Sequence, residues 1–367
     1  MFFKKSINKL SRIFNLPRVP GYPIGAWIEP TTRCNVRCKT CGKFVLDEKY
    51  KDLDPEVYDK FVNQVLPHIC EVILTGWGEP LLFPRFEELL QKSFEFGVKV
   101  IFITNGTLLT KEIIEDMVKH SGQIYLSVDG ATKETFEFIR PQIKFEKIIG
   151  VLENIKKCSE RLKNPNFKFS INFVAIRSNL SELIQMIELA HKYGAGELCV
   201  LNFWLGNRSD EFTSESLKYY PEMIDKIFPE AQTRALELGI KLILPYYGAS
   251  KYSPENKNHT TDKVIVKKVP LTGCLKKPIF QKCYSPWRDV YITVEGGVRP
   301  CCMPTDYLGN LKMQSLKEIW NGENFQRLRK RIHTDNPPPY CRICNVAWGI
   351  TGGDENYFAE AQEDRVC

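Results

Sequence analysis

The chain has 367 residues, of which 43% are hydrophobic and 26% are charged, and its formal net charge is +7. This composition is typical of a folded globular protein, and the length predicts one large domain with a smaller one beside it. No apolar run is long enough to span a membrane, and the basic N-terminus lacks the apolar core and cleavage site of a signal peptide. Thirteen clustered cysteines argue against a secreted disulfide framework and favour a cytoplasmic protein.

Residues 1–23 predict a short basic helix ahead of the first strand. Apolar residues recur at helical spacing until Pro17, and the first twenty residues carry no acid. The apolar residues are Phe3, Ile7, Leu10 and Phe14, and the basic residues are Lys4, Lys5, Lys9, Arg12 and Arg18. We expect the apolar stripe to dock on the domain that follows. The alternative is contact with an anionic membrane surface or a partner, which would make the protein peripheral to the membrane.

Residues 24–245 alternate between apolar strand-like runs and helical patterns. Strands are predicted over 24–29, 71–75, 98–104, 123–129, 167–175 and 197–203. Helices are expected between them, for example over 55–66 and 180–193. Six such units in series predict an α/β fold with a parallel sheet, in which functional residues gather at the carboxyl ends of the strands.

Three closely spaced cysteines, Cys34, Cys38 and Cys41, follow the first predicted strand. A structural zinc site would need a fourth ligand nearby, but the next candidates are His68 and Cys70. Three thiolates suit a four-iron cluster in which one iron keeps no protein ligand and can bind a small molecule. The alternatives are zinc with water in its fourth position, or three unrelated thiols.

The spacing Cys-x3-Cys-x2-Cys resembles the radical S-adenosylmethionine (SAM) superfamily. Three later segments agree and come in that family's order, at the ends of successive strands: Gly76-Trp77-Gly78-Glu79-Pro80, Thr104-Asn105-Gly106 and Ser127-Val128-Asp129-Gly130. The first looks like the family's Gly-Gly-Glu-Pro motif, with Trp77 in place of the first glycine. The resemblance implies a partial (β/α)6 TIM-like barrel over residues 24–245. Thr40 replaces the large residue that usually contacts adenine, so Phe44 is an alternative contact.

The resemblance also implies the cofactors. A [4Fe-4S] cluster on Cys34, Cys38 and Cys41 would bind SAM. One electron, supplied by a donor such as flavodoxin or ferredoxin, would cleave SAM reductively. The resulting 5′-deoxyadenosyl radical would take a hydrogen atom from the substrate.

By motif position, the resemblance gives several polar residues a role at SAM. Glu79 would accept a hydrogen bond from the SAM ammonium, and Gly76, Trp77 and Gly78 share its motif, with Gly78 allowing close backbone approach. Ser127 or Asp129 would bind the ribose, Asn105 would face the same mouth, and Arg140 would pair with the SAM carboxylate or else cap a helix.

Cys199, which we expect to end the sixth strand, is a candidate hydrogen donor to a substrate radical. The alternative is that it is a small buried hydrophobic residue.

Residues 246–270 are predicted to be a linker or mobile loop, and residues 346–367 a C-terminal tail. Between them, residues 271–345 hold a second cysteine set, Cys283, Cys301, Cys341 and Cys344, with a hairpin over 290–299 and a helix over 316–332. These four thiolates would suit zinc. Their spacing also resembles the SPASM domain or its shortened twitch form, which implies one auxiliary [4Fe-4S] cluster. Cys302 could replace Cys301, and Cys274 and Cys367 do not match the spacing.

These features predict a radical SAM enzyme, and the single auxiliary cluster favours a small hydroxylated or sugar-like substrate that is dehydrogenated or epimerised. The alternatives are a peptide or protein maturase, a modifier of lipids or membrane-linked glycans, and an electron-transfer protein that is not an enzyme. No basic stripe interleaved with aromatic residues indicates nucleic-acid binding.

Overall fold

In the computed structural model, the described residues are 8, 10–45, 50–203, 211–245, 283–302, 306–334 and 336–342. The predicted linker over 246–270 and tail over 346–367 lie outside these ranges, as do Cys274, Cys344 and Cys367.

A single ten-stranded sheet organises the protein, in the order β10-β9-β8-β1-β2-β3-β4-β5-β6-β7. The strands from β1 to β7 are all parallel and follow the chain order. They are β1 (Gly25–Ile28), β2 (Glu71–Leu74), β3 (Lys99–Thr104), β4 (Gln123–Ser127), β5 (Lys168–Ala175), β6 (Glu197–Asn202) and β7 (Lys241–Ile243). The six predicted strands are confirmed, and β7 is one that the sequence patterns did not indicate.

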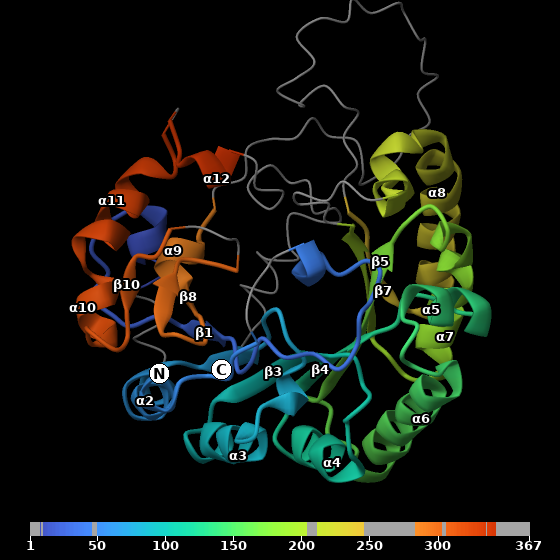
Figure 1. The fold of residues 1–367 in the computed structure, drawn as a ribbon, viewed down its shortest axis with the longest axis horizontal. Helices are drawn as coiled ribbons and strands as arrows, with labels where there is room; N and C mark the ends of the chain where they lie inside the picture. Colours follow the sequence, from blue (N-terminus) through green and yellow to red (C-terminus); the bar gives the residue numbers. More distant parts are fainter. Residues whose placement is uncertain are drawn as a thin grey trace, which may run out of the picture.

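Helices cover the outer face of this curved sheet (Figure 1). They are α2 (Pro55–Lys60), α3 (Phe86–Glu95), α4 (Lys111–Lys119), α5 (Lys133–Ile139), α6 (Phe145–Leu162), α7 (Leu183–Lys192) and α8 (Pro221–Leu238). Both faces of the central strands are therefore covered, which explains continuous apolar runs such as the fully buried β2. Side chains on the inner face, including Ile73, Ile101 and Tyr125, form a separate cluster inside the barrel.

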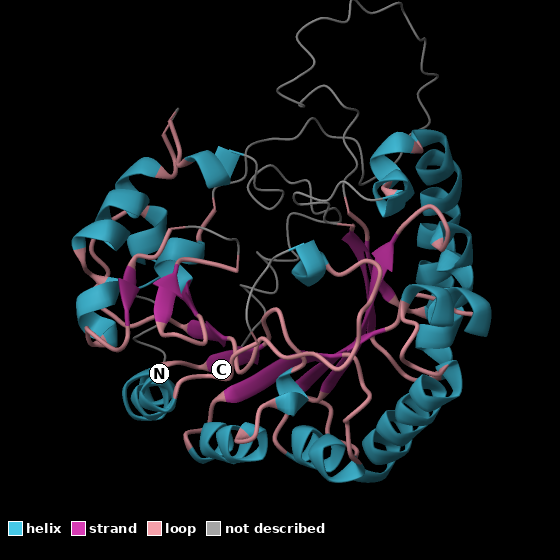
Figure 2. Ribbon diagram, viewed as in Figure 1, coloured by secondary structure: helices cyan, strands magenta, loops and turns pink. Residues whose placement is uncertain are grey.

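The C-terminal unit continues the same sheet instead of forming a detached domain (Figure 2). Its strand β8 (Asp289–Ile292) pairs in parallel with β1, and the expected hairpin is formed by β8 with β9 (Gly297–Arg299). The unit is completed by α9 (Ser285–Arg288), β10 (Gly309–Asn310), α10 (Leu316–Trp320), α11 (Glu323–Arg331) and α12 (Pro339–Arg342). The helix expected over 316–332 is thus divided into α10 and α11, which are separated by Asn321 and Gly322.

The N-terminal segment differs from the expected docking. It runs along α9 and α11 of the C-terminal unit, not along the barrel (Figure 1). Leu10 and Phe14, from the apolar stripe, are 53% and 68% exposed, so the prediction that this stripe packs inward is wrong for both. Phe3 and Ile7 lie outside the described residues.

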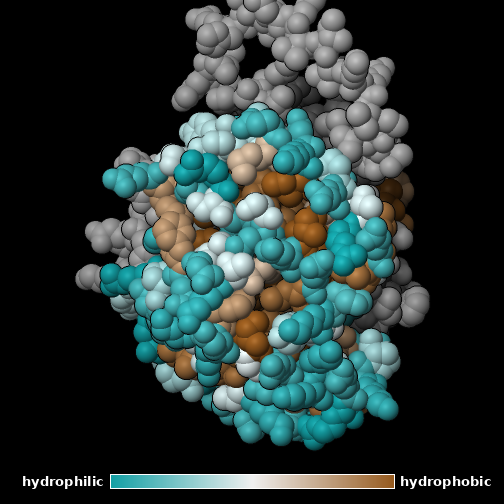
Figure 3. Space-filling model, turned by 90° about the vertical axis from the view of Figure 1, so that its right-hand side faces the viewer, coloured by the Kyte–Doolittle hydropathy of each residue, from teal (hydrophilic) through white to brown (hydrophobic). Residues whose placement is uncertain are grey.

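The barrel face formed by the outer helices is largely hydrophilic, with hydrophobic side chains showing between polar ones (Figure 3). Within the described parts of the chain, no helix combines the length and apolar character that crossing a bilayer requires.

A buried charge network joins the barrel to the C-terminal unit at the amino ends of β2, β1 and β8. The Arg288 guanidinium contacts Glu71 at 2.5 Å and Asp289 at 2.6 Å. All three residues are at most 6% exposed. Gly25 of β1 lies between the two carboxylates, and a Cβ atom there would stand 2.5 Å from an oxygen of Asp289. One buried guanidinium therefore contacts acids on both sides of the seam between the barrel and the C-terminal unit.

Replacing that arginine should destabilise the whole protein. Arg288→Met removes the cation that contacts both Glu71 and Asp289 in this buried network, which should lower the free energy of unfolding by about 3–5 kcal/mol. Urea unfolding measures the change. The control is Arg234→Met, whose pairs with Glu188 and Glu237 are exposed, and it should cost less than about 1 kcal/mol. Equal losses in the two variants would contradict this account.

Candidate active site at the cysteine loop

The cysteine loop, residues 30–41, leaves the carboxyl end of β1. Cys34, Cys38 and Cys41 are all partly buried, and none forms a disulfide. The backbone N–H of Cys41 donates to the carbonyl oxygen of Cys38 at 3.0 Å. The strands β2, β3 and β4 run parallel to β1, so their carboxyl ends meet this loop.

The turn after β2 packs directly on the cysteine loop. The backbone N–H of Glu79 donates to the carbonyl oxygen of Arg33 at 2.8 Å. A Cβ atom on Gly78 would stand 2.3 Å from the carbonyl oxygen of Thr31 and 2.4 Å from that of Arg33. Only glycine therefore permits this approach, and the backbone that Gly78 approaches is that of the cysteine loop.

Glu29, which directly follows β1, supports the same turn. Its carboxylate accepts the backbone N–H of Trp77 at 2.9 Å, and a Cβ atom on Gly76 would stand 2.4 Å from its side chain. Glu29 is 3% exposed. The start of the turn over 76–79 is therefore held by Glu29, and its end is held by the backbone of Glu79.

The end of β3 forms a second attachment through Glu79. The Glu79 carboxylate accepts the hydroxyl of Thr104 and the backbone N–H of Asn105, both at 2.7 Å. The Asn105 amide then donates to Asn35 at 2.9 Å and lies 3.9 Å from the sulfur of Cys34. Asn105 therefore contacts the cysteine loop in this structure, and its expected place at the SAM site remains a prediction.

A third attachment comes from the loop after α5. The backbone N–H of Arg37 donates to Gln142 at 2.9 Å, and that of Lys39 donates to the carbonyl oxygen of Ile139 at 2.9 Å. Arg140 lies between Ile139 and Gln142 in the chain. The same segment therefore also brings a cation beside the cysteines.

Asp129 and Arg140 pair with each other. The guanidinium contacts one carboxylate oxygen of Asp129 through Nε at 2.8 Å and a terminal nitrogen at 2.7 Å. The other oxygen accepts the backbone N–H of Val174 at 2.8 Å. Both side chains are at most 8% exposed. Their expected contacts with ribose and SAM carboxylate remain predictions, and the pairing connects the segment after β4 to the loop after α5.

Burial shifts the ionisation of two groups at the mouth. Desolvation raises the pKa of Glu79 to about 7, opposed by the hydrogen bonds from Asn105 and Thr104. Desolvation also raises the pKa of Cys38 to about 11, and the nearby charge of Arg140 opposes that rise. A metal that binds here therefore displaces a thiol proton, with Arg140 stabilising the thiolate.

Ser127 and Cys199 occupy different positions along their strands. Ser127 is the last residue of β4 and is partly exposed. Cys199 is the third residue of β6, which continues to Asn202, so the expectation that Cys199 ends its strand is wrong. It is fully buried, and its thiol contacts Glu197 at 3.2 Å. Nothing in this placement tests its expected role as a hydrogen donor.

The second cysteine set is described in part. Cys283, Cys301 and Cys341 are partly buried and free of disulfides, and Cys302 is exposed. Burial raises the pKa of Tyr340 to about 12, and charges at Cys341, Asp306 and Cys301 add to the shift. Cys301 and Cys341 therefore lie near the same hydroxyl, although 40 positions separate them in the numbering.

The donor set at the cysteine loop fits an iron–sulfur cluster. Three free thiols share one loop, with Arg140 as a nearby cation. Within the described residues, no group of three or more His, Cys, Asp or Glu side chains is placed to hold a single metal ion. A four-iron cluster sets a different requirement, because each of its thiolates binds a separate iron.

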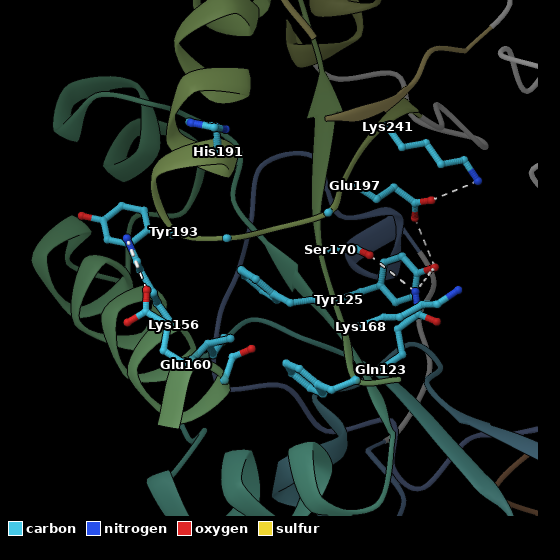
Figure 4. A pocket seen from close by; sticks show the side chains of 16 residues that line it. Gln123, Tyr125, Lys156, Glu160, Lys168, Ser170, His191, Tyr193, Glu197 and Lys241 are labelled. Atoms are coloured by element: carbon cyan, nitrogen blue, oxygen red, sulfur yellow. Dashed lines mark hydrogen bonds and ion pairs between the residues drawn. The ribbon is translucent and has the colours of Figure 1, made fainter. Parts of the chain in front are cut away.

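Two cavities differ in their relation to the cysteines. A cavity of about 390 Å³ lies beside the loop, where Arg33, Cys34 and Arg37 line it together with Tyr50 and Gln142. A larger cavity of about 630 Å³ lies at the other end of the barrel, near the amino ends of the strands (Figure 4). It is lined by the residues that begin four successive strands, Gln123, Lys168, Glu197 and Lys241. The smaller cavity is the one that adjoins the candidate site.

Sequence reasoning missed several residues that position the site. Glu29 and Asn35 make the contacts described above, yet neither was singled out, and Thr104 was quoted in a motif without a role. Glu29 is the last residue of the strand predicted over 24–29, so the rule that polar residues gather at strand ends would have found it. Asn35 carried no comparable signal, because its partner Asn105 is 70 residues away in the sequence.

Family comparisons agree with this geometry. Residues 28–190 match the family model of the radical SAM superfamily, and residues 283–345 match SPASM, an iron–sulfur-cluster-binding domain. The chain therefore contains a radical SAM domain followed by a C-terminal SPASM domain. Proteins of this class bind a [4Fe-4S] cluster, SAM and auxiliary iron–sulfur clusters.

Individual relatives are distant but match most of the chain. The AdoMet-dependent heme synthase of Methanosarcina barkeri is 27% identical over 308 residues, which are 83% of this chain and 84% of that protein. The PqqA peptide cyclase of Gluconobacter oxydans is 23% identical over 89% of this chain and 84% of its own length. The crystal structure of Streptococcus suis SuiB bound to SAM has a TM-score of 0.62 at 14% identity, covering 94% of this chain and 76% of that chain. This last likeness concerns the fold alone.

The pKa of Glu79 predicts how stability depends on pH in the absence of SAM. Between its ordinary value of 4.5 and about 7, the folded protein holds a proton that the unfolded chain has released. The free energy of unfolding should therefore fall by about 2 kcal/mol as the pH rises from about 5.5 to 7.5. Urea unfolding across this range measures the slope, and Glu79→Gln should reduce it. An unchanged slope in Glu79→Gln would assign the dependence to other groups.

The contact of Gly78 with the cysteine loop predicts a defect in cluster binding. Gly78→Ala places a methyl group against two carbonyl oxygens, so the loop must move, and about four irons per chain should be lost after anaerobic reconstitution. Iron and acid-labile sulfide assays measure this. The control is Gly150→Ala in α6, where a Cβ atom meets nothing within 4 Å. If both variants kept the iron of the wild type, the loop would not depend on this contact.

Proposed function

We propose that this enzyme is a maturase that takes a hydrogen atom from a peptide. The observation that carries the proposal is the similarity to PqqA peptide cyclase over 339 residues, which is 89% of the chain. A second relative, the mycofactocin maturase MftC of Mycolicibacterium smegmatis, is 27% identical over 175 residues, about half of each protein. Peptide modification was an alternative to the small hydroxylated substrate expected from the cysteine pattern, and these relatives favour the alternative.

The cysteine loop would hold the SAM-binding cluster through Cys34, Cys38 and Cys41. When bound, the cluster supplies the electron that cleaves SAM and generates the hydrogen-abstracting radical. The protein's own residues position the reaction. Glu79 lies in the motif that meets the SAM ammonium, and its buried carboxylate has hydrogen-bonding capacity beyond Thr104 and Asn105. Ser127, at the end of β4, is the candidate ribose contact.

The second cysteine set would hold auxiliary iron–sulfur chemistry. We infer one cluster on Cys283, Cys301, Cys341 and Cys344, of which Cys344 lies outside the described residues. The match of residues 283–345 to the SPASM iron–sulfur-cluster-binding domain supports a shared centre. A one-electron donor such as flavodoxin or ferredoxin would supply reducing equivalents.

A tetrapyrrole substrate is the second candidate. The observation in its favour is the similarity to AdoMet-dependent heme synthases. One of them is 27% identical over 308 residues, compared with 23% for the PqqA peptide cyclase. Arg33, which pairs with Asp52 at 2.8 Å, and Arg37 line the cavity beside Cys34, and a basic lining would suit carboxylates on either a peptide or a tetrapyrrole. The distinction therefore needs a substrate experiment.

Deuterium transfer distinguishes the two substrate classes. The reconstituted enzyme receives SAM, a reductant and one probe: side-chain-deuterated PqqA peptide, side-chain-deuterated SuiA peptide, or an iron porphyrin deuterated on its side chains. We expect deuterium in 5′-deoxyadenosine with at least one peptide and none with the porphyrin, as measured by mass spectrometry. Transfer from the porphyrin alone would establish the second candidate, and no transfer from either peptide would overturn the peptide proposal.

Matched cysteine variants control this experiment. Cys38→Ala should abolish 5′-deoxyadenosine formation with every probe, because it removes a cluster ligand. Cys158→Ala changes a buried cysteine of α6 in the hydrophobic core and should leave the reaction intact. Loss of activity in both variants would indicate misfolding instead of loss of the cluster.

A further inference from the structure

The N-terminal segment over 8–18 is attached to the C-terminal unit through polar contacts. The indole N–H of Trp287 donates to the carbonyl oxygen of Leu16 at 2.7 Å, and the Arg329 guanidinium donates to that of Pro17 at 3.0 Å. Both donors belong to buried side chains of α9 and α11. The segment is therefore fixed at a defined position on the surface.

The orientation of this segment is the reverse of an ordinary surface helix. Asn8 and Ser11, one helical turn apart, are 2% and 1% exposed and face inward. Four large apolar side chains face solvent, and we call them the Leu10–Leu16 patch. They are Leu10, Ile13, Phe14 and Leu16, which are 53%, 54%, 68% and 42% exposed.

The concentration of these side chains distinguishes the patch from the rest of the described surface. Other exposed apolar residues, such as Phe96 and Leu236, occur singly along the chain. Single exposed apolar residues are normal in globular proteins, whereas a group of them marks an interaction surface.

Basic side chains accompany the patch in the same segment and on the helix that contacts it, and together we call them the cationic rim. Arg12 and Arg18 belong to the same segment, and α11, which contacts it through Arg329, exposes basic side chains in its last turns. These are Arg327, Lys330 and Arg331. The sequence adds Lys4, Lys5 and Lys9, and the first twenty residues contain no acid. An apolar group within a cationic rim is complementary to a surface that is apolar beneath an anionic layer.

We propose that the Leu10–Leu16 patch inserts into the interface of an anionic lipid bilayer and holds the enzyme reversibly at the membrane surface. The cationic rim would contact lipid phosphates while the apolar side chains enter the headgroup–acyl boundary. Neither contribution is large alone, so binding should need both the apolar side chains and the anionic lipid. A protein partner would instead require a complementary surface. The test below distinguishes this case for a second copy of the chain.

Vesicle co-sedimentation of the full-length, reconstituted enzyme tests the proposal. We expect binding to phosphatidylcholine vesicles containing phosphatidylglycerol, little binding to phosphatidylcholine alone, and loss of binding at high salt. Arg18→Gln and Lys330→Gln should each weaken partitioning by about fivefold. Ile13→Ser with Phe14→Ser should weaken it by about tenfold or more.

Matched variants and a solution measurement keep the test decisive. Phe96→Ser with Leu236→Ser removes the same number of exposed apolar side chains from the barrel helices and should leave binding unchanged. All variants should retain 5′-deoxyadenosine formation, which shows that they fold. Absence of wild-type binding to the anionic vesicles, or equal binding by the Ile13/Phe14 variant, would overturn the proposal. So would a dimer in solution that Phe14→Ser dissociates, because the patch would then belong to a second copy.

Discussion

The candidate site depends on the contact between the turn over 76–79 and the cysteine loop. Gly78 brings the two backbones together, and the N–H of Glu79 holds the carbonyl oxygen of Arg33. The carboxylate of the same glutamate holds the end of β3, which in turn holds Asn35. One residue thus connects three successive strand ends, so the cysteine positions are set by the barrel and not by the loop itself. This arrangement fixes the geometry of the loop through its contacts with the barrel.

Buried charges serve the two ends of the barrel differently. At the carboxyl ends, the pair of Asp129 and Arg140 positions a loop and brings a cation near thiols whose ionised form it stabilises. At the amino ends, Arg288 contacts Glu71 and Asp289 across the seam with the C-terminal unit. Buried ion pairs contribute little net stability, but removing one partner is costly. Both networks therefore specify position more than they add free energy.

The fold and the outline of the site followed from local patterns. Apolar runs located six of the parallel strands, and the motifs at their ends located the cysteine loop, Glu79 and Asn105. Contacts between distant segments could not be read in this way. Arg140 and Asp129 were each assigned to SAM, because no local pattern shows that a helix end and a strand end form a pair. The strand predicted over 197–203 ends within one residue of β6, but Cys199, the third residue of that strand, was wrongly taken as its end. The N-terminal stripe was oriented wrongly, because its spacing indicates a face but not which face is buried.

The parallel pairing of β8 with β1 limits how far the two domains can be treated as separable modules. Strand β1 is a central strand only because β8 covers one of its edges. A truncation that kept the barrel and removed the C-terminal unit would expose the backbone of residues 25–28 as a free sheet edge, beside apolar side chains that are buried in the intact protein. Such an edge is a template for pairing with another chain. Isolated barrels of this protein would therefore tend to aggregate, and transplanting the C-terminal unit onto another barrel would require a matching first strand.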